Sequence, residues 1–186
     1  MENIFDQLIN SYLINHVGIS DHFLSDKLAG SLKDNLTDLY STGSLKSAGI
    51  GNDDNASVNK LIRSDKIFWL DKSHQDKFED AFFLLIDEFI LHLNSTCYAG
   101  ITGYEFHYAF YEAGSFYKRH LDQFNSNKDR AFTVILYLNE NWVYADGGQL
   151  CVHYEHTMQI IAPLNGRCIF FKSSELEHEV LLTVKP

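Results

Sequence analysis

Cysteine is scarce in this chain of 186 residues, which holds only three. Cys97, Cys151 and Cys168 are widely spaced and form no C-x-x-C pair, so neither a disulfide framework nor a common zinc motif is present. We therefore expect reduced thiols that pack as small apolar side chains, as is usual for a cytoplasmic protein.

Basic residues and long apolar runs are also few. Lys and Arg number 15 against 25 Asp and Glu, and the formal net charge of −10 argues against sequence-independent binding of nucleic acid. No stretch approaches the roughly 18 consecutive apolar residues of a membrane span. The N-terminal Met1–Asp6 lacks the basic and apolar regions of a secretory signal. We expect a cytoplasmic protein with neither a nucleic-acid partner nor a membrane partner.

Apolar and aromatic residues are plentiful. Hydrophobic residues make up 45% of the chain and aromatic residues 14%, which is typical of a compact globular protein. A chain of this length can bury a substantial core as one domain. We therefore predict a single domain over residues 1–186, with helical support over residues 1–100.

Helical periodicity dominates the N-terminal half. Closely spaced apolar residues predict a helix over residues 2–10, and a brief strand is expected over Tyr12–Val17. Ser20 is the expected N-cap of a second helix, whose leucines recur at helical intervals up to Leu39. The strongest apolar stripe predicts a helix over residues 75–94 that packs on a sheet. Its solvated face is expected to carry Glu79, Asp80, Asp87 and Glu88.

Residues 41–60 are rich in Ser, Gly, Asn and Asp, which predicts a flexible loop. Such a loop is longer than a compact domain usually carries without a function. An insertion without function and a lid or finger that orders around a partner both stay open. The strand expected over residues 61–70 places Arg63 and Asp65 on one face, and Trp69 is expected in the core.

From Tyr104 onward the apolar pattern alternates as in strands. Turn residues such as Gly114, Asn125–Lys128 and Asn165-Gly166 separate the apolar runs. We predict an α+β, mainly β fold, with a double-stranded β-helix (jelly-roll) core over residues 101–186 behind supporting N-terminal helices. The predicted strands are roughly 104–111, 116–122, 131–139, 148–154, 157–162, 167–172 and 178–184.

The chemistry is concentrated in two short segments, Tyr111–Asp122 and Glu177–Glu179. Side chains alternate along a strand, so His120 and Asp122 point to the same side, about 7 Å apart along the chain. An H-x-D triplet alone is weak evidence, because about one is expected by chance with nine histidines. If a distant strand adds His178, two imidazoles and one carboxylate form the ligand set typical of non-haem Fe(II) oxygenases.

These segments resemble the prolyl-hydroxylase branch of the Fe(II)- and 2-oxoglutarate-dependent dioxygenases. The similarity is strongest to bacterial prolyl hydroxylases that act on elongation factor Tu and to animal oxygen-sensing prolyl hydroxylases. It covers roughly residues 61–184 and implies that His120, Asp122 and His178 bind Fe(II). It also implies 2-oxoglutarate and O₂ as cosubstrates, with ascorbate as an additional candidate. The motifs are Ile62-Arg-Ser-Asp-Lys-Ile-Phe-Trp69, Tyr111-x-x-Gly114-x-x-Tyr117-x-x-His120-x-Asp122, Leu136-Tyr-Leu-Asn139, Asp146-Gly-Gly-x-Leu150 and Glu177-His-Glu-Val180.

The resemblance also implies a site for 2-oxoglutarate. Tyr137 matches the tyrosine that hydrogen-bonds its far carboxylate, and Tyr111 matches another tyrosine of the same pocket; ordinary half-buried strand tyrosines remain the alternative for both. The family further has a basic residue about nine positions after the second histidine, which here falls beyond Pro186. We expect either a chain truncated before that residue, or a clamp that is missing or improvised from Lys185, and favour truncation. A lysine lacks the two-pronged fork of arginine.

Arg63 and Asp65 match a charged pair that the relatives associate with a substrate loop. By this resemblance Asp65 pairs with Arg130 and tethers the loop beside the iron. An exposed tether of this kind stabilises by at most about 1 kcal/mol, so its value is positional. A purely structural role for the pair stays open.

The function implied by the resemblance is hydroxylation of a prolyl residue in a protein. The partner is then a protein with an accessible proline, with elongation factor Tu as the candidate. Hydroxylation of a free amino acid or small metabolite stays open, as does a catalytically silent jelly-roll module that only holds metal. A 2-oxoglutarate turnover assay with and without a proline-containing protein distinguishes these alternatives.

Overall fold

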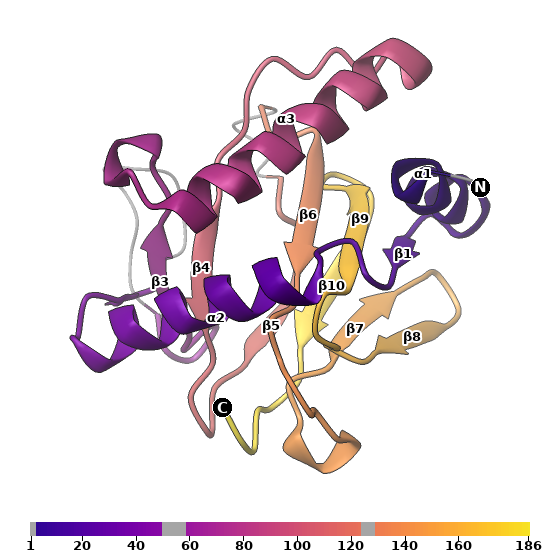
Figure 1. Ribbon diagram of the computed structural model, residues 1–186. Coiled ribbons are helices and arrows are strands. Elements are labelled where there is room, and N and C mark those ends of the chain that lie inside the picture. The colour runs from indigo at the N-terminus through magenta and orange to yellow at the C-terminus, as the bar shows by residue number, and fades with distance from the viewer. Residues whose placement is uncertain (1–2, 50–58, 124–128) are drawn as a thin grey trace.

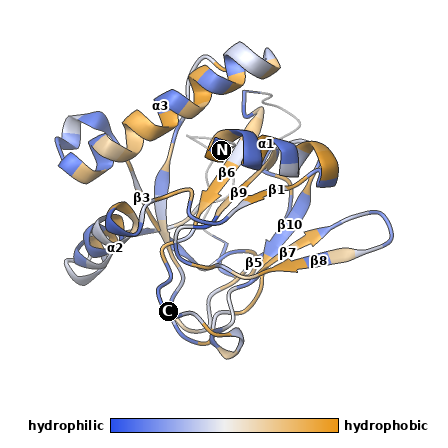
Figure 2. Ribbon diagram, turned by 45° about the vertical axis from the view of Figure 1, so that its right-hand side comes forward, coloured by the Kyte–Doolittle hydropathy of each residue, from blue (hydrophilic) through white to orange (hydrophobic). Residues whose placement is uncertain are grey.

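The computed structural model describes residues 3–49, 59–123 and 129–186. Residues 50–58 of the segment predicted as a loop, and the predicted turn at Asn125–Lys128, lie outside these residues. Three long helices lie against one side of a set of antiparallel sheets, and β7 and β8 lie away from α2 and α3 (Figures 1 and 2). Among the described residues, no helix is long and apolar enough to cross a bilayer.

Each long helix begins at a side chain that accepts hydrogen bonds from free backbone N–H groups of the first turn. Asn3 caps α1 (Ile4–Asn15), Ser25 caps α2 (Asp26–Ser41), and Asp76 caps α3 (Lys77–Cys97). Two predictions for the residues between α1 and α2 are wrong, as the bounds of these helices show.

The predicted strand over Tyr12–Val17 is largely helix, because α1 continues to Asn15 and ends at His16 in a left-handed conformation. Ser20 is not the N-cap of the second helix. It is the last residue of the short strand β1 (Gly18–Ser20), and the serine five residues later takes that role.

The apolar stripe of α3 is buried as predicted, with Phe82, Ile86, Phe89 and Leu93 each at most 4% exposed. The acidic face is only partly correct, since Glu79 is 4% exposed and its Oε2 lies 2.9 Å from Nδ1 of His74. The short 3-10 helix η2 (Lys72–His74) brings that imidazole over the first turn of α3. A charged helix residue is buried here because it has a partner.

The described strands form three antiparallel sheets, with orders β1-β9-β6, β5-β10-β7-β8 and β2-β3-β4. The first two face each other as the predicted jelly roll, and every strand predicted after residue 104 is present. The strand β1 from the N-terminal part joins the first sheet beside β9. The remaining bounds are β2 (Lys46–Ser47), β3 (Lys66–Trp69), β4 (His107–Phe110), β5 (Tyr117–His120), β6 (Phe132–Leu136), β7 (Leu150–His153), β8 (Met158–Ile161), β9 (Cys168–Lys172) and β10 (Glu177–Val180), with a further 3-10 helix η3 (Tyr144–Asp146).

Strand β9 separates two hydrophobic cores. Its residues Cys168 and Phe170 face the helices, where Phe170 packs edge-on against Phe89 at 5.6 Å between ring centres. Ile169 and Phe171 face the second sheet, where they form the other core with Leu150, Val152, Ile161 and Leu176. The alternation of side chains therefore lets one strand serve both cores, and β9 is apolar and buried from Cys168 to Phe171 (Figure 2).

Two further expectations about burial are wrong. Trp69 is 47% exposed, because it ends β3 beyond its pairing with the two-residue β2 and only packs edge-on against His107. Cys97 at the end of α3 is exposed, whereas Cys151 and Cys168 are buried as predicted.

Candidate metal centre

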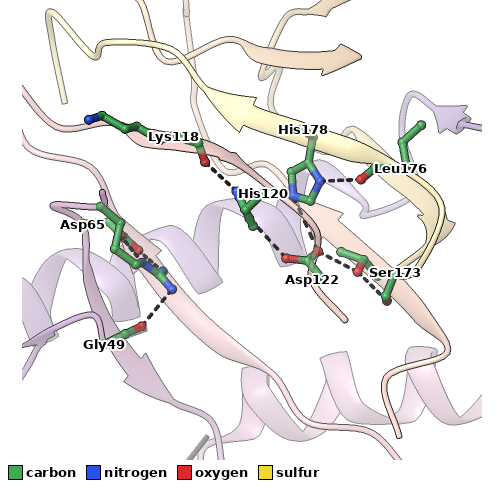
Figure 3. A network of polar contacts seen from close by, with 10 residues as sticks. Gly49, Asp65, Lys118, His120, Asp122, Ser173, Leu176 and His178 are labelled. Atoms are coloured by element: carbon green, nitrogen blue, oxygen red, sulfur yellow. Dashed lines mark hydrogen bonds and ion pairs between the residues drawn. The ribbon is translucent and has the colours of Figure 1, made fainter. Parts of the chain in front are cut away.

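His120, Asp122 and His178 meet at the end of two neighbouring strands. In the antiparallel pair of β5 and β10, His120 and His178 are direct cross-strand partners. Asp122 follows two residues after His120, and its two carboxylate oxygens lie 3.3 Å from Nε2 of His120 and 3.5 Å from Nε2 of His178. One potential ligand atom from each residue lies within 4.8 Å of the others. Figure 3 shows the three side chains pointing toward one another. The structure thus brings together the three residues that the sequence singled out.

Each imidazole is oriented by a backbone carbonyl that contacts Nδ1, the ring nitrogen that does not face Asp122. Nδ1 of His120 lies 2.7 Å from the carbonyl oxygen of Lys118, and Nδ1 of His178 lies 3.0 Å from that of Leu176 (Figure 3). A carbonyl only accepts hydrogen bonds, so each Nδ1 donates to its carbonyl, and each Nε2 is left on the side of Asp122, where an ion would bind. This is the arrangement that orients histidines as metal ligands.

The carboxylate is held as well, by a residue that the sequence analysis missed. The hydroxyl of Thr133 donates to Oδ2 of Asp122 at 2.7 Å, and it lies 2.8 Å from the hydroxyl of Ser173. Thr133 is on β6, in the opposite sheet. Thr133 is a polar residue within the otherwise apolar strand β6, which could have marked it as functional. No pattern in the sequence, however, indicates which carboxylate it contacts.

The protonation states suit a divalent cation. Burial tends to raise the pKa of Asp122, but the hydrogen bond with His120, the nearby His178 and the Thr133 hydroxyl together hold it below its usual range. Burial lowers the pKa of His178, more than the Asp122 carboxylate raises it. An ionised carboxylate and a neutral imidazole are the forms that bind metal, so the donor set fits Fe(II).

A stack of side chains leads outward from the centre. The ring of Tyr117 stacks on His120 at 3.5 Å between ring centres, and the guanidinium of Arg63 lies 4.3 Å from the centre of the Tyr117 ring. Arg63 also binds both carboxylate oxygens of Asp65, at 2.8 and 2.6 Å. Its Nη1 donates to the carbonyl of Gly49 at 3.4 Å, at the edge of the described residues (Figure 3).

The predicted tether between Asp65 and Arg130 is wrong. Asp65 is 1% exposed and is bound by Arg63, which lies two residues earlier on the same face of the chain. Arg130 instead pairs with Glu105 at 2.6 Å, and both side chains are about half exposed. The sequence identified the correct charged residues but not how they pair.

The two tyrosines predicted for 2-oxoglutarate are both half-buried. Tyr137 follows β6 and packs against the core between the sheets. Burial raises the pKa of each phenol, and Asp65 and Tyr137 add to the rise for Tyr111. Both phenols are therefore protonated and able to donate a hydrogen bond to a carboxylate.

Lys185 does not lie where the improvised clamp requires it. Strand β10 ends at Val180, so Lys185 is not on a strand, and its side chain is exposed. Its backbone N–H donates to the carbonyl of Asp146 at 3.0 Å, beside the Gly147–Thr183 bridge. The prediction that Lys185 continues the strand of His178, and so shares the face of a basic residue two positions later, is therefore wrong.

Comparison with known proteins agrees with this geometry. Residues 106–186 match the model of the 2OG-Fe(II) oxygenase superfamily, and the matched region contains all three residues of the centre. This part of the chain is therefore similar to that superfamily. A search of curated proteins finds no match.

Solved structures place this oxygenase more finely. A prolyl-4-hydroxylase from Pseudomonas putida superposes with a TM-score of 0.89 at 29% identity, covering 98% of this chain and 94% of its own. A prolyl hydroxylase from Trichoplax adhaerens, in complex with a peptide fragment of the hypoxia inducible factor oxygen degradation domain, gives 0.83 at 29%, covering 97% and 84%. A prolyl 4-hydroxylase from Phytophthora capsici, at 18% identity and a TM-score of 0.74, shares the fold and covers 98% of this chain and 60% of its own. The oxygenase is a 2-oxoglutarate-dependent dioxygenase of the prolyl-hydroxylase type that uses Fe(II), 2-oxoglutarate and O₂.

Proposed function

We propose that this oxygenase hydroxylates a prolyl residue in a protein substrate, with Fe(II) bound by His120, Asp122 and His178. The observation that carries the proposal is the convergence of these ligand atoms within 4.8 Å, each oriented by a further hydrogen bond. Two imidazoles and one carboxylate on one side of an ion leave positions free for the cosubstrates.

Iron held by these residues would supply the oxidising chemistry, in which O₂ gives one oxygen atom to 2-oxoglutarate, forming succinate and CO₂, and the other to a C–H bond of the substrate. The residues of this chain supply binding and orientation. Thr133 and the two backbone carbonyls hold the ligands in place before the ion arrives, which lowers the cost of ordering them. The protonated phenols of Tyr137 and Tyr111 would donate hydrogen bonds to the carboxylate of 2-oxoglutarate.

The substrate would enter past Arg63 and Tyr117, with Asp65 holding the Arg63 guanidinium from the buried side. The ring of Tyr117 connects the charged pair to His120, so a polypeptide that contacts Arg63 lies one ring away from the metal ligands. The Trichoplax enzyme binds a peptide fragment, which supports a protein substrate for this chain as well. Elongation factor Tu, in the cytoplasm, is the proposed partner, on the resemblance of the motifs to the bacterial enzymes. Arg130 pairs with Glu105 and has no assigned contact to substrate in this proposal.

The test is a turnover assay with the full chain, Fe(II) and 2-oxoglutarate. We expect succinate formation to rise when elongation factor Tu or its proline-containing peptides are added, and one peptide to gain the mass of a single oxygen atom at a proline. Replacing that proline by alanine is the matched control and should abolish both signals. If free proline or another small molecule stimulates turnover as well as the protein does, the protein-substrate proposal is wrong.

A further inference from the structure

A second group of potential metal ligands lies on the reverse side of the sheet that carries His178. Successive side chains of a strand point to opposite faces, so Glu179 points away from the iron face of β10. Cys151 and His153 of β7 point the same way, because Cys151 is the direct cross-strand partner of Glu179 and His153 lies two residues further on. The residues between them, Val152 and His178, point into the space between the sheets.

The three outward side chains are close enough to share one ion. One ligand atom each from Cys151, His153 and Glu179 lies within 4.8 Å of the others. Tetrahedral zinc with thiolate, imidazole and carboxylate ligands places such atoms about 3.3–3.8 Å apart. Nε2 of His153 already lies 2.8 Å from Oε1 of Glu179, so an ion would replace the proton between them. Small rotations of two partly exposed side chains would complete the site.

The surroundings favour a soft or borderline cation. Cys151 is 2% exposed, and its sulfur lies 3.8 Å from the thioether of Met158 on β8. The guanidinium of Arg119, which interacts electrostatically with Cys151, is bound by the carboxylate of Glu177 and so presents little net positive charge. Among the described residues, neither of the other two cysteines belongs to such a cluster: Cys97 is exposed at the end of α3, and Cys168 faces the helical core.

We propose that Cys151, His153 and Glu179 form a second metal site, selective for Zn²⁺, on the outer face of the β5-β10-β7-β8 sheet. Thiolate and imidazole together favour zinc over the hard cations Mg²⁺ and Ca²⁺, and three protein ligands leave one position for water. The site is separate from the iron centre, since adjacent residues of β10 serve the two faces. It does not depend on the proposed substrate.

Cobalt is the probe, because a Co²⁺–thiolate bond gives a near-ultraviolet charge-transfer absorption that the sulfur-free iron centre cannot give. We expect the full chain to develop this band on titration with Co²⁺, in the wild type and also in Asp122→Ala, where the iron centre has lost a ligand. One equivalent of Zn²⁺ should remove the band, because zinc binds such sites more tightly than cobalt.

Variants locate the site. Cys151→Ser should remove the band, whereas Cys97→Ser should keep it. His153→Gln should weaken Co²⁺ binding by more than the roughly 10- to 100-fold loss typical of a residue that only orients a ligand. His156→Gln, at a histidine whose side chain is 84% exposed, is its matched control. Should Cys151→Ser unfold, the partly exposed His153 carries the test alone.

Three results would overturn the proposal. The first is no thiolate band in the wild type at saturating Co²⁺, in which case His153 and Glu179 are only a hydrogen-bonded pair. The second is a band that survives Cys151→Ser in a folded variant. The third is a band that Zn²⁺ does not displace, which would contradict the assignment to zinc.

Discussion

The two faces of strand β10 carry two clusters of candidate metal ligands. The clusters differ in how their side chains are held in place before an ion binds. On the inner face, each of the three residues is fixed by a group outside the cluster: the carbonyls of Lys118 and Leu176, and the hydroxyl of Thr133. On the outer face, His153 and Glu179 bind each other instead. The inner side chains are therefore oriented by groups that would stay in place when an ion binds, whereas the outer cluster has to break the hydrogen bond between His153 and Glu179. Adjacent positions of one strand can thus hold a permanent and a conditional site.

The same contrast holds for two arginine–carboxylate pairs near these clusters. Arg63 and Asp65 form a bidentate pair whose carboxylate is fully buried. Arg119 and Glu177 form a pair whose side chains are each about half exposed. Burial, and not the number of hydrogen bonds, decides how much the loss of one partner costs.

The largest effect is expected at the inner cluster. Asp122→Ala removes the only carboxylate among its ligands, so both Fe(II) affinity and 2-oxoglutarate turnover should fall by more than about 100-fold. Asp34→Ala, on an exposed position of α2, is the control and should match the wild type. Equal Fe(II) affinity of the two variants, measured by titration in the absence of oxygen, would contradict the assignment of the centre.

Next in size is the buried arginine pair. Arg63→Ala leaves the carboxylate of Asp65 buried without a partner, which should lower the free energy of unfolding by about 3–5 kcal/mol. The measurement is equilibrium denaturation by urea, with the double variant Arg63→Ala/Asp65→Leu as a comparison. We expect the double variant to recover part of the loss, since it no longer buries a charge; no recovery would mean that packing of the arginine on Tyr117 dominates.

Thr133→Val tests the orientation of the carboxylate without touching a ligand. It removes the hydroxyl that donates to Asp122 and keeps the shape of the side chain, so Fe(II) affinity should fall by about 10- to 100-fold. The exposed Thr42→Val is the control. The cobalt–thiolate band of the outer face should be unchanged in both variants. An unchanged Fe(II) affinity would show that Asp122 is positioned without Thr133.

The smallest effect is expected at the exposed pair. Arg119→Gln should change the free energy of unfolding by no more than about 1 kcal/mol, because solvent screens the interaction. The same denaturation measurement as for Arg63 gives a direct comparison. A loss as large as that of Arg63→Ala would remove the distinction between buried and exposed pairs.

Much of the sheet and of the iron centre could be predicted from the sequence. Alternating apolar residues after Tyr104 located the strands, and the two-residue spacing of His120 and Asp122 placed them on one face. The resemblance added His178. No local pattern in the sequence indicates that β5 and β10 are neighbours. The contact between His178 and His120 therefore became visible only in the register of the sheet.

The errors have a common cause, which is that partners come from distant parts of the chain. Thr133 was missed because the carboxylate to which it donates, that of Asp122, belongs to the opposite sheet. Glu79 was expected in solvent because His74 on a separate short helix could not be foreseen as its partner. Arg130 was assigned to Asp65, although Arg63 on the same face was closer. Local periodicity identifies faces, but pairing between elements depends on the tertiary fold.

The most direct test of the account is Fe(II)-dependent conversion of 2-oxoglutarate to succinate, compared between the wild type and His178→Ala in the presence of a proline-containing protein substrate. The account predicts substrate-stimulated succinate formation in the wild type and none above background in the folded variant, because the ligand from β10 is lost. Substrate-stimulated turnover at the wild-type rate in His178→Ala would contradict it.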